Sequence, residues 1–515
     1  MVSGQRTMNV PFISTGNMDQ SYTSTFALGA FVAFVLVSAA TLFSSIRTHQ
    51  RYAALGATAP SVVRSNSFGL NLFIGMVKSV RSHQFHIWSQ LLLEKHNHTM
   101  ELRMFGERLV MTDDPENIKA IQETQFWDLA KSEEQRIIFQ HIFGDAIFGM
   151  NGEEWKAEAA LYRMHLSHVR ESHVSVTEKH LLNSFALLDE EDNDVADIVD
   201  RLQLDVVTEV FLGESANSLT SNQQQFRAAV ETLQKIACLR QLLGKVGVWL
   251  NDKYLAPRAV KCVRDYQNTI ADKAFLRAGD PVSAPTCLID DLIRQGKSHR
   301  DIRNAVTSIL SAGKDPAATA LAFAFYEIAK RPDVFRKMKA EVEEHLTPNR
   351  LPTLADLRKL KYIKMVVKET LRNHHPLGYN PRVPVKDITL PRGGGSDGRS
   401  PVSLLKGTQI IYSLVSLQNR EDLGAPDASV WRPERWERWK PRSKWEFVPF
   451  NHGPRICLGQ QFANFQMEYF FARLCQEYES ILLLSQTQPQ EGLMRLELNT
   501  KLAYPVYAKC VRKSI

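Results

Sequence analysis

The ten residues Phe450-Asn-His-Gly-Pro-Arg-Ile-Cys-Leu-Gly459 place a cysteine inside a short loop, and this stretch decides how the rest of the chain is interpreted. Gly453 and Gly459 flank Cys457, and the helix-like run from Gln460 to Glu468 follows directly. A cysteine at a helix N-terminus gains from the positive end of the helix dipole and from unpaired backbone N–H groups, which lower the pKa of the thiol. The two glycines allow the backbone to approach a flat ligand closely. The stretch therefore predicts a reactive thiolate beside a planar group.

Arg455, two residues before the cysteine, is expected to lower the pKa of the thiol further. The stretch resembles the haem-binding loop of the cytochromes P-450, whose pattern is Phe-x-x-Gly-x-Arg-x-Cys-x-Gly. The five fixed positions of that pattern are filled by Phe450, Gly453, Arg455, Cys457 and Gly459. The resemblance implies haem b as the cofactor, with Cys457 as the axial iron ligand. The commoner fate of a lone cysteine is a buried structural role. We expect that role for the other five, Cys238, Cys262, Cys287, Cys475 and Cys510.

The resemblance also implies the architecture, which is mostly α with small β-sheets in one large cytochrome P-450 fold, preceded by one N-terminal transmembrane helix. The predicted parts are a disordered luminal N-terminus at 1–21, a membrane anchor at 22–46, a linker and first helix at 47–89, and the haem-thiolate catalytic domain at 90–515.

The bulk composition excludes several classes of protein. The chain has 515 residues, a net charge of +7, and no basic block interleaved with aromatic residues, so nucleic acid is not an expected partner. Six unevenly spaced cysteines do not suggest a disulfide framework or a zinc site, and they fit a reducing compartment.

Residues 26–46 carry no charge, and as a helix they span about 30 Å, enough to cross a bilayer. A cleaved signal peptide is the competing interpretation, but its apolar region is usually shorter and follows a charged residue. Here Arg47, His49 and Arg51 follow the run instead. Positive charge after the span predicts a single-pass anchor in the endoplasmic reticulum membrane, with a luminal N-terminus and a cytosolic catalytic domain.

Asn151-Gly-Glu-Glu-Trp155 resembles the start of the family's C-helix, where Trp-x-x-x-Arg points an indole N–H and a guanidinium at a haem propionate. Trp155 is present, but Ala159 occupies the arginine position. Arg163 lies one turn further along roughly the same helix face and is a possible substitute.

Ser298 to Arg331 is predicted to be one long helix, with Ser298 as its N-cap. Its centre resembles the family's oxygen-activating motif, Ala/Gly-Gly-x-Asp/Glu-Thr, and the resemblance makes Asp315 the expected proton relay. The threonine position holds Pro316, which predicts a kink near Gly313, because proline lacks an N–H and crowds the carbonyl four residues earlier. Thr319, three residues on, is a possible source of the missing hydroxyl.

Glu369 and Arg372 form the family's Glu-x-x-Arg, and their i, i+3 spacing allows an ion pair on one helix face. Arg435 lies in a segment similar to the family's Pro-Glu-Arg-Phe and is expected to complete that network. The resemblance gives these three residues a structural role. Arg382, after His375-Pro376, is expected to pair with a propionate, as are Arg455 and Trp155.

Several segments are expected from local pattern alone. Residues His98–Thr112 are predicted to form a β-hairpin around Gly106. Residues 175–297 are predicted to form several amphipathic helices. The segment 387–416 is predicted to be strands and turns, and 493–509 a closing β-hairpin.

The amino-acid sequences of three segments are most similar to those of fungal hydroxylases of n-alkanes and fatty acids. These segments are Cys457–Ala463, Leu390–Gly395 and the box at Pro433. The resemblance implies a membrane-anchored monooxygenase that oxidises an apolar substrate, either fatty-acid-like or a fungal secondary-metabolite intermediate. It would use O2 and electrons from NADPH–cytochrome P-450 reductase. Two alternatives stay open, namely a haem-thiolate isomerase or dehydratase acting on a peroxide without reductase, and a haem-binding protein without turnover.

Overall fold

The chain divides into two compact units, Met1–Gly56 and Ala57–Ile515. The computed structural model describes residues 46–48, 50–56, 61–65, 69–190, 193–221, 224–243, 257–279, 287–423, 427–484 and 492–513. In the first unit the described residues up to 55 are helical. The predicted N-terminal segment at 1–21 and the predicted anchor at 22–46, apart from Ile46, lie outside the described residues. None of the helices in the described ranges is long and apolar enough to cross a membrane.

The second unit is mostly helical with small sheets, as predicted. Its longer helices are α2 Leu70–Arg81, α3 Phe85–Lys95, α5 Glu133–Phe143, α6 Gly152–Leu166, α7 Glu171–Leu188, α8 Val195–Val207, α9 Gln224–Leu243, α11 Pro257–Ala278, α13 His299–Gly313, α14 Asp315–Ala329, α15 Pro332–His345, α17 Lys361–Asn373 and α20 Gln460–Glu477. The shorter ones are α4 Pro115–Lys119, α12 Leu288–Arg294, α16 Leu354–Leu357, α18 Leu414–Gln418 and α19 Arg435–Arg438. The segment 47–89 therefore holds α2 and the start of α3, where one helix was expected.

The helix starts follow from side-chain caps in the sequence. Ser298 accepts a hydrogen bond from the N–H of Asp301, whose side chain in turn accepts from the N–H of Ser298. This capping box confirms Ser298 as the N-cap of α13. Asp114 caps α4, and Pro115 occupies the first turn of that helix, where a missing N–H costs nothing.

The largest sheet has six strands in the order β1-β2-β3-β8-β5-β4. Their bounds are β1 Ser61–Val62, β2 Thr99–Met104, β3 Glu107–Thr112, β4 Leu129–Ala130, β5 Tyr379–Pro384 and β8 Gln409–Ser413. Strands β2 and β3 pair antiparallel around Gly106, which has φ +81°, so the predicted hairpin is confirmed. Strand β6 Ile388–Gly394 pairs with β7 Ser400–Leu404.

The predicted hairpin over 493–509 is wrong in its extent. Strands β10 Met494–Leu496 and β11 Thr500–Leu502 form a short hairpin. The following strand, β12 Ala508–Arg512, instead pairs antiparallel with β9 Tyr478–Leu483, which follows α20. The alternation of apolar and polar residues in this segment predicts strands, but it does not show which strands pair with each other.

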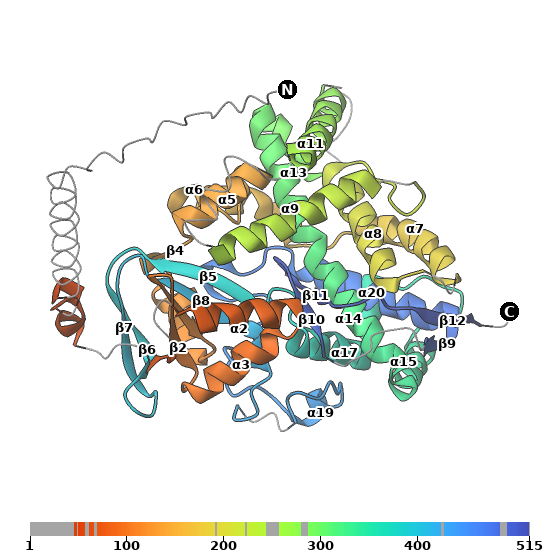
Figure 1. Cartoon of the computed structure of the whole chain (residues 1–515). Helices are drawn as coiled ribbons and strands as arrows, with labels where there is room; N and C mark the ends of the chain where they lie inside the picture. Colours follow the sequence, from red (N-terminus) through yellow and green to blue (C-terminus); the bar gives the residue numbers. More distant parts are fainter. Residues whose placement is uncertain are drawn as a thin grey trace, which may run out of the picture. The chain divides into compact units, whose positions relative to one another are not determined.

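Helices α13 and α14 pass through the middle of the second unit, with β2 and β5–β8 on one side and α7, α8 and α15 on the other (Figure 1). Every residue of α14 except Pro316 is buried. A helix that is buried all round belongs to the core of a large domain. This helix pair is the scaffold that carries the oxygen-activating segment.

Candidate active site

Cys457 lies in the loop between a short turn, Gly453–Arg455, and helix α20. Its backbone N–H donates to the carbonyl of Phe450 at 2.9 Å, and the residue is exposed. The predicted helix after the cysteine is confirmed and extends to Glu477. Of the other cysteines, Cys287 and Cys475 are buried.

Gln122 holds the first residues of this loop, Asn451 and His452, in place. Nothing in the sequence alone indicated this role. The side-chain oxygen of Gln122 accepts the N–H of His452 at 2.7 Å, and its amide donates to Oδ1 of Asn451 at 2.8 Å. A Cβ on Gly453, which has φ +67°, would lie 2.0 Å from the carbonyl oxygen of Gln122. Gly453 is therefore needed for a close approach between two backbones. A Cβ on Gly459 would meet nothing within 4 Å, so this side of the loop is open.

The expected lowering of the pKa of Cys457 is wrong for the protein alone. Although the residue is exposed at the surface, the protein atoms around its sulfur partly remove it from water and raise the pKa of the thiol, and the backbone N–H of Gly459 opposes that effect. The Arg455 guanidinium donates to the carbonyl of Met150 and lies 4.7 Å over the ring of Trp155, so it is directed away from the sulfur. A thiol in such a site becomes a thiolate when a metal ion coordinates it.

Three cationic side chains meet beside this loop without an anion to balance them. Arg382 on β5 donates to the carbonyl of Pro381 at 2.8 Å, and Arg455 bonds as described above. Neither these two nor Lys131 has a carboxylate within ion-pair distance among the described residues. Burial and the charges of Arg382 and Arg455 lower the pKa of Lys131 well below its usual range. Burial and the charge of Arg382 likewise lower the pKa of Arg455 to about 9. The cluster fits a ligand that carries carboxylates.

Lys131 was missed by sequence reasoning because it lies between β4 and α5, in no motif. Asn151, the N-cap of α6, holds its backbone from both sides: Oδ1 accepts the N–H of Lys131 at 2.9 Å, and Nδ2 donates to its carbonyl at 3.1 Å. Ala159 is buried in a cluster with Trp155, whereas Arg163 is exposed. The structure therefore brings Lys131, and not Arg163, to the cation cluster.

The predicted long helix is broken at Lys314 into α13 and α14, and Pro316 lies in the first turn of α14. This confirms the kink and corrects the single helix. Ala312 is exposed and Pro316, four residues later, is half-buried on the same helix face. Neither of these two side chains carries a hydroxyl.

Asp315 is buried, 1% exposed, and its carboxylate is not free. Nζ of Lys314 lies 2.5 Å from its Oδ1, and the amide of Gln234 on α9 donates to its Oδ2. Lys314 also pairs with Asp200 on α8 at 2.6 Å. Asp315 and Thr319 line a cavity of about 560 Å³ that α8, α9, α14 and the β10–β11 hairpin enclose.

The predicted structural network is present and fully buried. Glu369 and Arg372 on α17 are each 0% exposed and form a bidentate pair at 2.8 and 2.9 Å. Arg435 lies 3.3 Å from the same carboxylate. The N–H of Arg432 and the indole N–H of Trp436 donate to Glu369 at 2.9 and 3.0 Å. Five donors thus satisfy one buried carboxylate.

A lone accessible cysteine at the start of a helix, beside unpaired cations, is the donor set expected of a haem-thiolate protein. The family profile of cytochrome P-450 matches residues 67–504. Similar proteins include cytochrome P-450 monooxygenase fsdH of Fusarium heterosporum, 30% identical over 90% of this chain and 85% of that protein. Others are cytochrome P-450 monooxygenase himC of Aspergillus japonicus, 31% identical over 91% and 87%, and cytochrome P-450 52A1 of Candida tropicalis, 31% identical over 74% and 75%.

The chain belongs to the cytochrome P-450 family and is a monooxygenase-type enzyme of that family. Membership implies a haem with a cysteine thiolate on its iron, and the family generally uses a redox partner, O2 and hydrophobic substrates. The resemblance inferred from the motifs is confirmed.

Proposed function

We propose that this protein is a haem-thiolate monooxygenase that binds haem b and inserts one oxygen atom of O2 into an apolar organic substrate. The substrate is fatty-acid-like or an intermediate of fungal secondary metabolism, and the electrons come from NADPH–cytochrome P-450 reductase. The observation that supports this most is the accessible Cys457 beside three cations, Lys131, Arg382 and Arg455, that have no carboxylate partner among the described residues.

The roles of the residues follow from their chemistry. Cys457 would supply the thiolate that binds the haem iron. Lys131, Arg382 and Arg455 hold the two propionates by charge-assisted hydrogen bonds. Bound haem supplies the reduction of O2 and the transfer of one oxygen atom. Asp315 takes up a proton from the polar cavity and passes it toward the open face of the helix break.

The test is turnover with purified reductase. We expect NADPH-dependent product from a panel of fatty acids, alkanes and polyketide-like compounds, selected first by their binding difference spectra. Pro316 in place of threonine favours one alternative, the isomerase or dehydratase, which would turn over a hydroperoxide without NADPH. A protein that binds haem but does neither would be the non-catalytic alternative.

We predict that Asp315→Asn lowers product formation by about 10²-fold or more, because a positioned acid contributes rate enhancement of that order. The measurement is product formed per minute at equal haem content. Asp197→Asn is the matched control, since Asp197 lines the same cavity but pairs with Arg227 and Arg201. Full activity of Asp315→Asn would rule out its role as the proton relay.

We predict that Lys131→Met releases haem about 10- to 100-fold faster, because hydrogen bonds to charged groups contribute about 1.5–3 kcal/mol. The measurement is transfer of haem to an apomyoglobin acceptor. Lys156→Met is the control, since Lys156 is exposed and forms an ion pair with Glu153.

The same residue sets a pH dependence. The pKa of Lys131 is lowered without a bound anion, and a propionate binds only the ammonium form. A bound propionate raises this pKa, so haem release should accelerate as pH rises through the pKa of the bound form, which lies above the lowered value, and Lys131→Met should lose this dependence. Identical release from both proteins at every pH would contradict the assignment.

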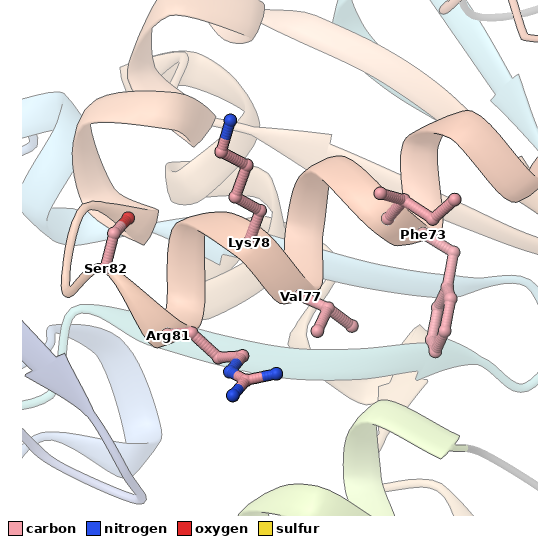
Figure 2. A pocket seen from close by; sticks show the side chains of 6 residues that line it. Phe73, Val77, Lys78, Arg81 and Ser82 are labelled. Atoms are coloured by element: carbon pink, nitrogen blue, oxygen red, sulfur yellow. The ribbon is translucent and has the colours of Figure 1, made fainter.

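We also propose that residues 22–46 anchor the protein in the endoplasmic reticulum membrane, with the catalytic domain in the cytosol. A second feature supports membrane association. A surface hollow of about 530 Å³ along α2 is lined by Phe73, Ile74, Val77, Lys78, Arg81 and Ser82, and Figure 2 shows Phe73 and Val77 on this helix with Lys78 and Arg81. Ile74 is 57% exposed. Apolar side chains beside basic ones suit the interface of an anionic membrane.

We predict that deleting residues 1–46 weakens but does not abolish membrane binding, and that Ile74→Ser with Val77→Ser removes the remainder. The measurement is flotation with vesicles containing anionic lipid. Leu276→Ser on α11, another exposed apolar residue, is the control. Unchanged flotation of the doubly substituted truncated protein would contradict a role for α2.

A further inference from the structure

Lys314 occupies the single residue between α13 and α14, and its ammonium is buried between two carboxylates. The side chain is 9% exposed and lies 2.6 Å from Asp200 and 2.5 Å from Asp315. We propose that Lys314 is a positioning residue that holds the Asp315 carboxylate against the polar cavity between α8, α9 and the β10–β11 hairpin, so that Asp315 takes its proton from that cavity. This inference rests on the proposed function and adds a residue and a direction of proton entry to it.

The local packing explains why the lysine is placed there. A Cβ on Gly313 would lie 3.1 Å from a methyl group of Val207, so α8 packs closely against the helix break. This contact brings Asp200 within reach of Lys314. On the other side, Gln234 of α9 donates to Asp315, so the carboxylate is held from two helices.

The electrostatics keep Lys314 and Asp200 charged. Burial opposes charge on Lys314, but Asp200 and Asp315 outweigh it and raise the pKa of the ammonium. Burial would raise the pKa of Asp200, yet the charges of Lys314, Lys501 and Arg227 lower it to about 2. Lys314 therefore stays an ammonium while a proton passes from water to Asp315 and onward, and no proton is gained or lost by the lysine.

The cavity is suited to hold that water, because its wall is lined largely by charged groups and polar walls hold water. The other charged groups that line the cavity beside the Asp200–Lys314–Asp315 cluster are Asp194 at the start of α8, Asp197 and Arg201 on α8, Arg227 and Glu231 on α9, and Arg495 and Lys501 on the β10–β11 hairpin. Asp200 is the more exposed end of the cluster, with a side chain 21% exposed, and Asp315 is the buried end. The cluster thus joins the wet cavity to the helix break, where Pro316 provides no hydroxyl.

The test compares three variants of the full-length holoenzyme with reductase, using the pH profile of product formation and the fraction of NADPH that ends in peroxide. Lys314→Met leaves two facing carboxylates that share a proton, so the alkaline decline of product formation should move up by about 1–3 pH units and the peroxide fraction should rise. Lys314→Arg should restore the wild-type profile. In Asp200→Asn, the Lys314 ammonium pairs with Asp315 alone, and the alkaline decline of product formation should move to lower pH.

A fold defect is separated from this role by haem content and by a fourth variant. Lys314→Met with Asp200→Asn contains no pair of facing carboxylates, so it should lose most of the upward shift seen in Lys314→Met. Wild-type profiles in all variants, or shifts of Lys314→Met and Asp200→Asn in one direction, would overturn the proposal. Failure of the proposed function is distinguishable, since wild-type protein itself would then form no NADPH-dependent product.

Discussion

Glu369→Ala should yield almost no haem-loaded protein. The substitution leaves Arg372 and Arg435, which are 0% and 4% exposed, without the carboxylate that both contact. Removing one partner of a buried ion pair costs about 3–5 kcal/mol, which is comparable with the whole stability of many domains, about 5–15 kcal/mol. The measurement is haem per protein after purification, together with the midpoint of denaturant unfolding.

A pair elsewhere in the chain provides a matched control. Glu133 and Arg136 on α5 have the same i, i+3 spacing and form the same bidentate contact, but their side chains are 62% and 42% exposed. Exposed pairs contribute about 0–1 kcal/mol, so Glu133→Ala should leave haem content and unfolding unchanged. Equal behaviour of the two variants would show that the Glu369 network is not essential to the fold.

Cys457→Ala should abolish NADPH-driven product formation, because the variant cannot supply a thiolate to the iron. Lys131, Arg382 and Arg455 remain in this variant, so some haem should still bind, with an altered spectrum. The measurements are product formation and the absorption spectrum at equal protein concentration.

Cys262→Ala is the control for the loss of a thiol, since Cys262 is half-buried on α11. It should retain wild-type turnover. Product formation by Cys457→Ala at the wild-type rate would exclude the cysteine as the ligand on which turnover depends.

Local features of the site could be predicted from sequence because neighbouring residues determine them. The helix after Cys457 follows from its own periodicity, the start of α13 from the hydrogen-bonding chemistry of Ser298, and the break near Gly313 from the geometry of Pro316. The Glu369–Arg372 pair follows from helical spacing, although its complete burial does not.

Features that depend on distant segments could not be predicted. Gln122 fixes a loop about 330 positions away, Lys131 joins Arg382 and Arg455 from a segment without a motif, and Gln234 reaches Asp315 from another helix. The raised pKa of Cys457 was missed for the same reason, because sequence shows the helix that follows but not the protein packed around the thiol. Partner choice between β9 and β12 is likewise set by tertiary packing.

The reduced carbon monoxide difference spectrum of the purified wild-type protein tests thiolate ligation most directly. With Cys457 as the axial ligand, the reduced complex should absorb at the long-wavelength position that gives the cytochromes P-450 their name, and Cys457→Ala should lose that band. A wild-type spectrum of the ordinary imidazole type would contradict thiolate ligation by Cys457.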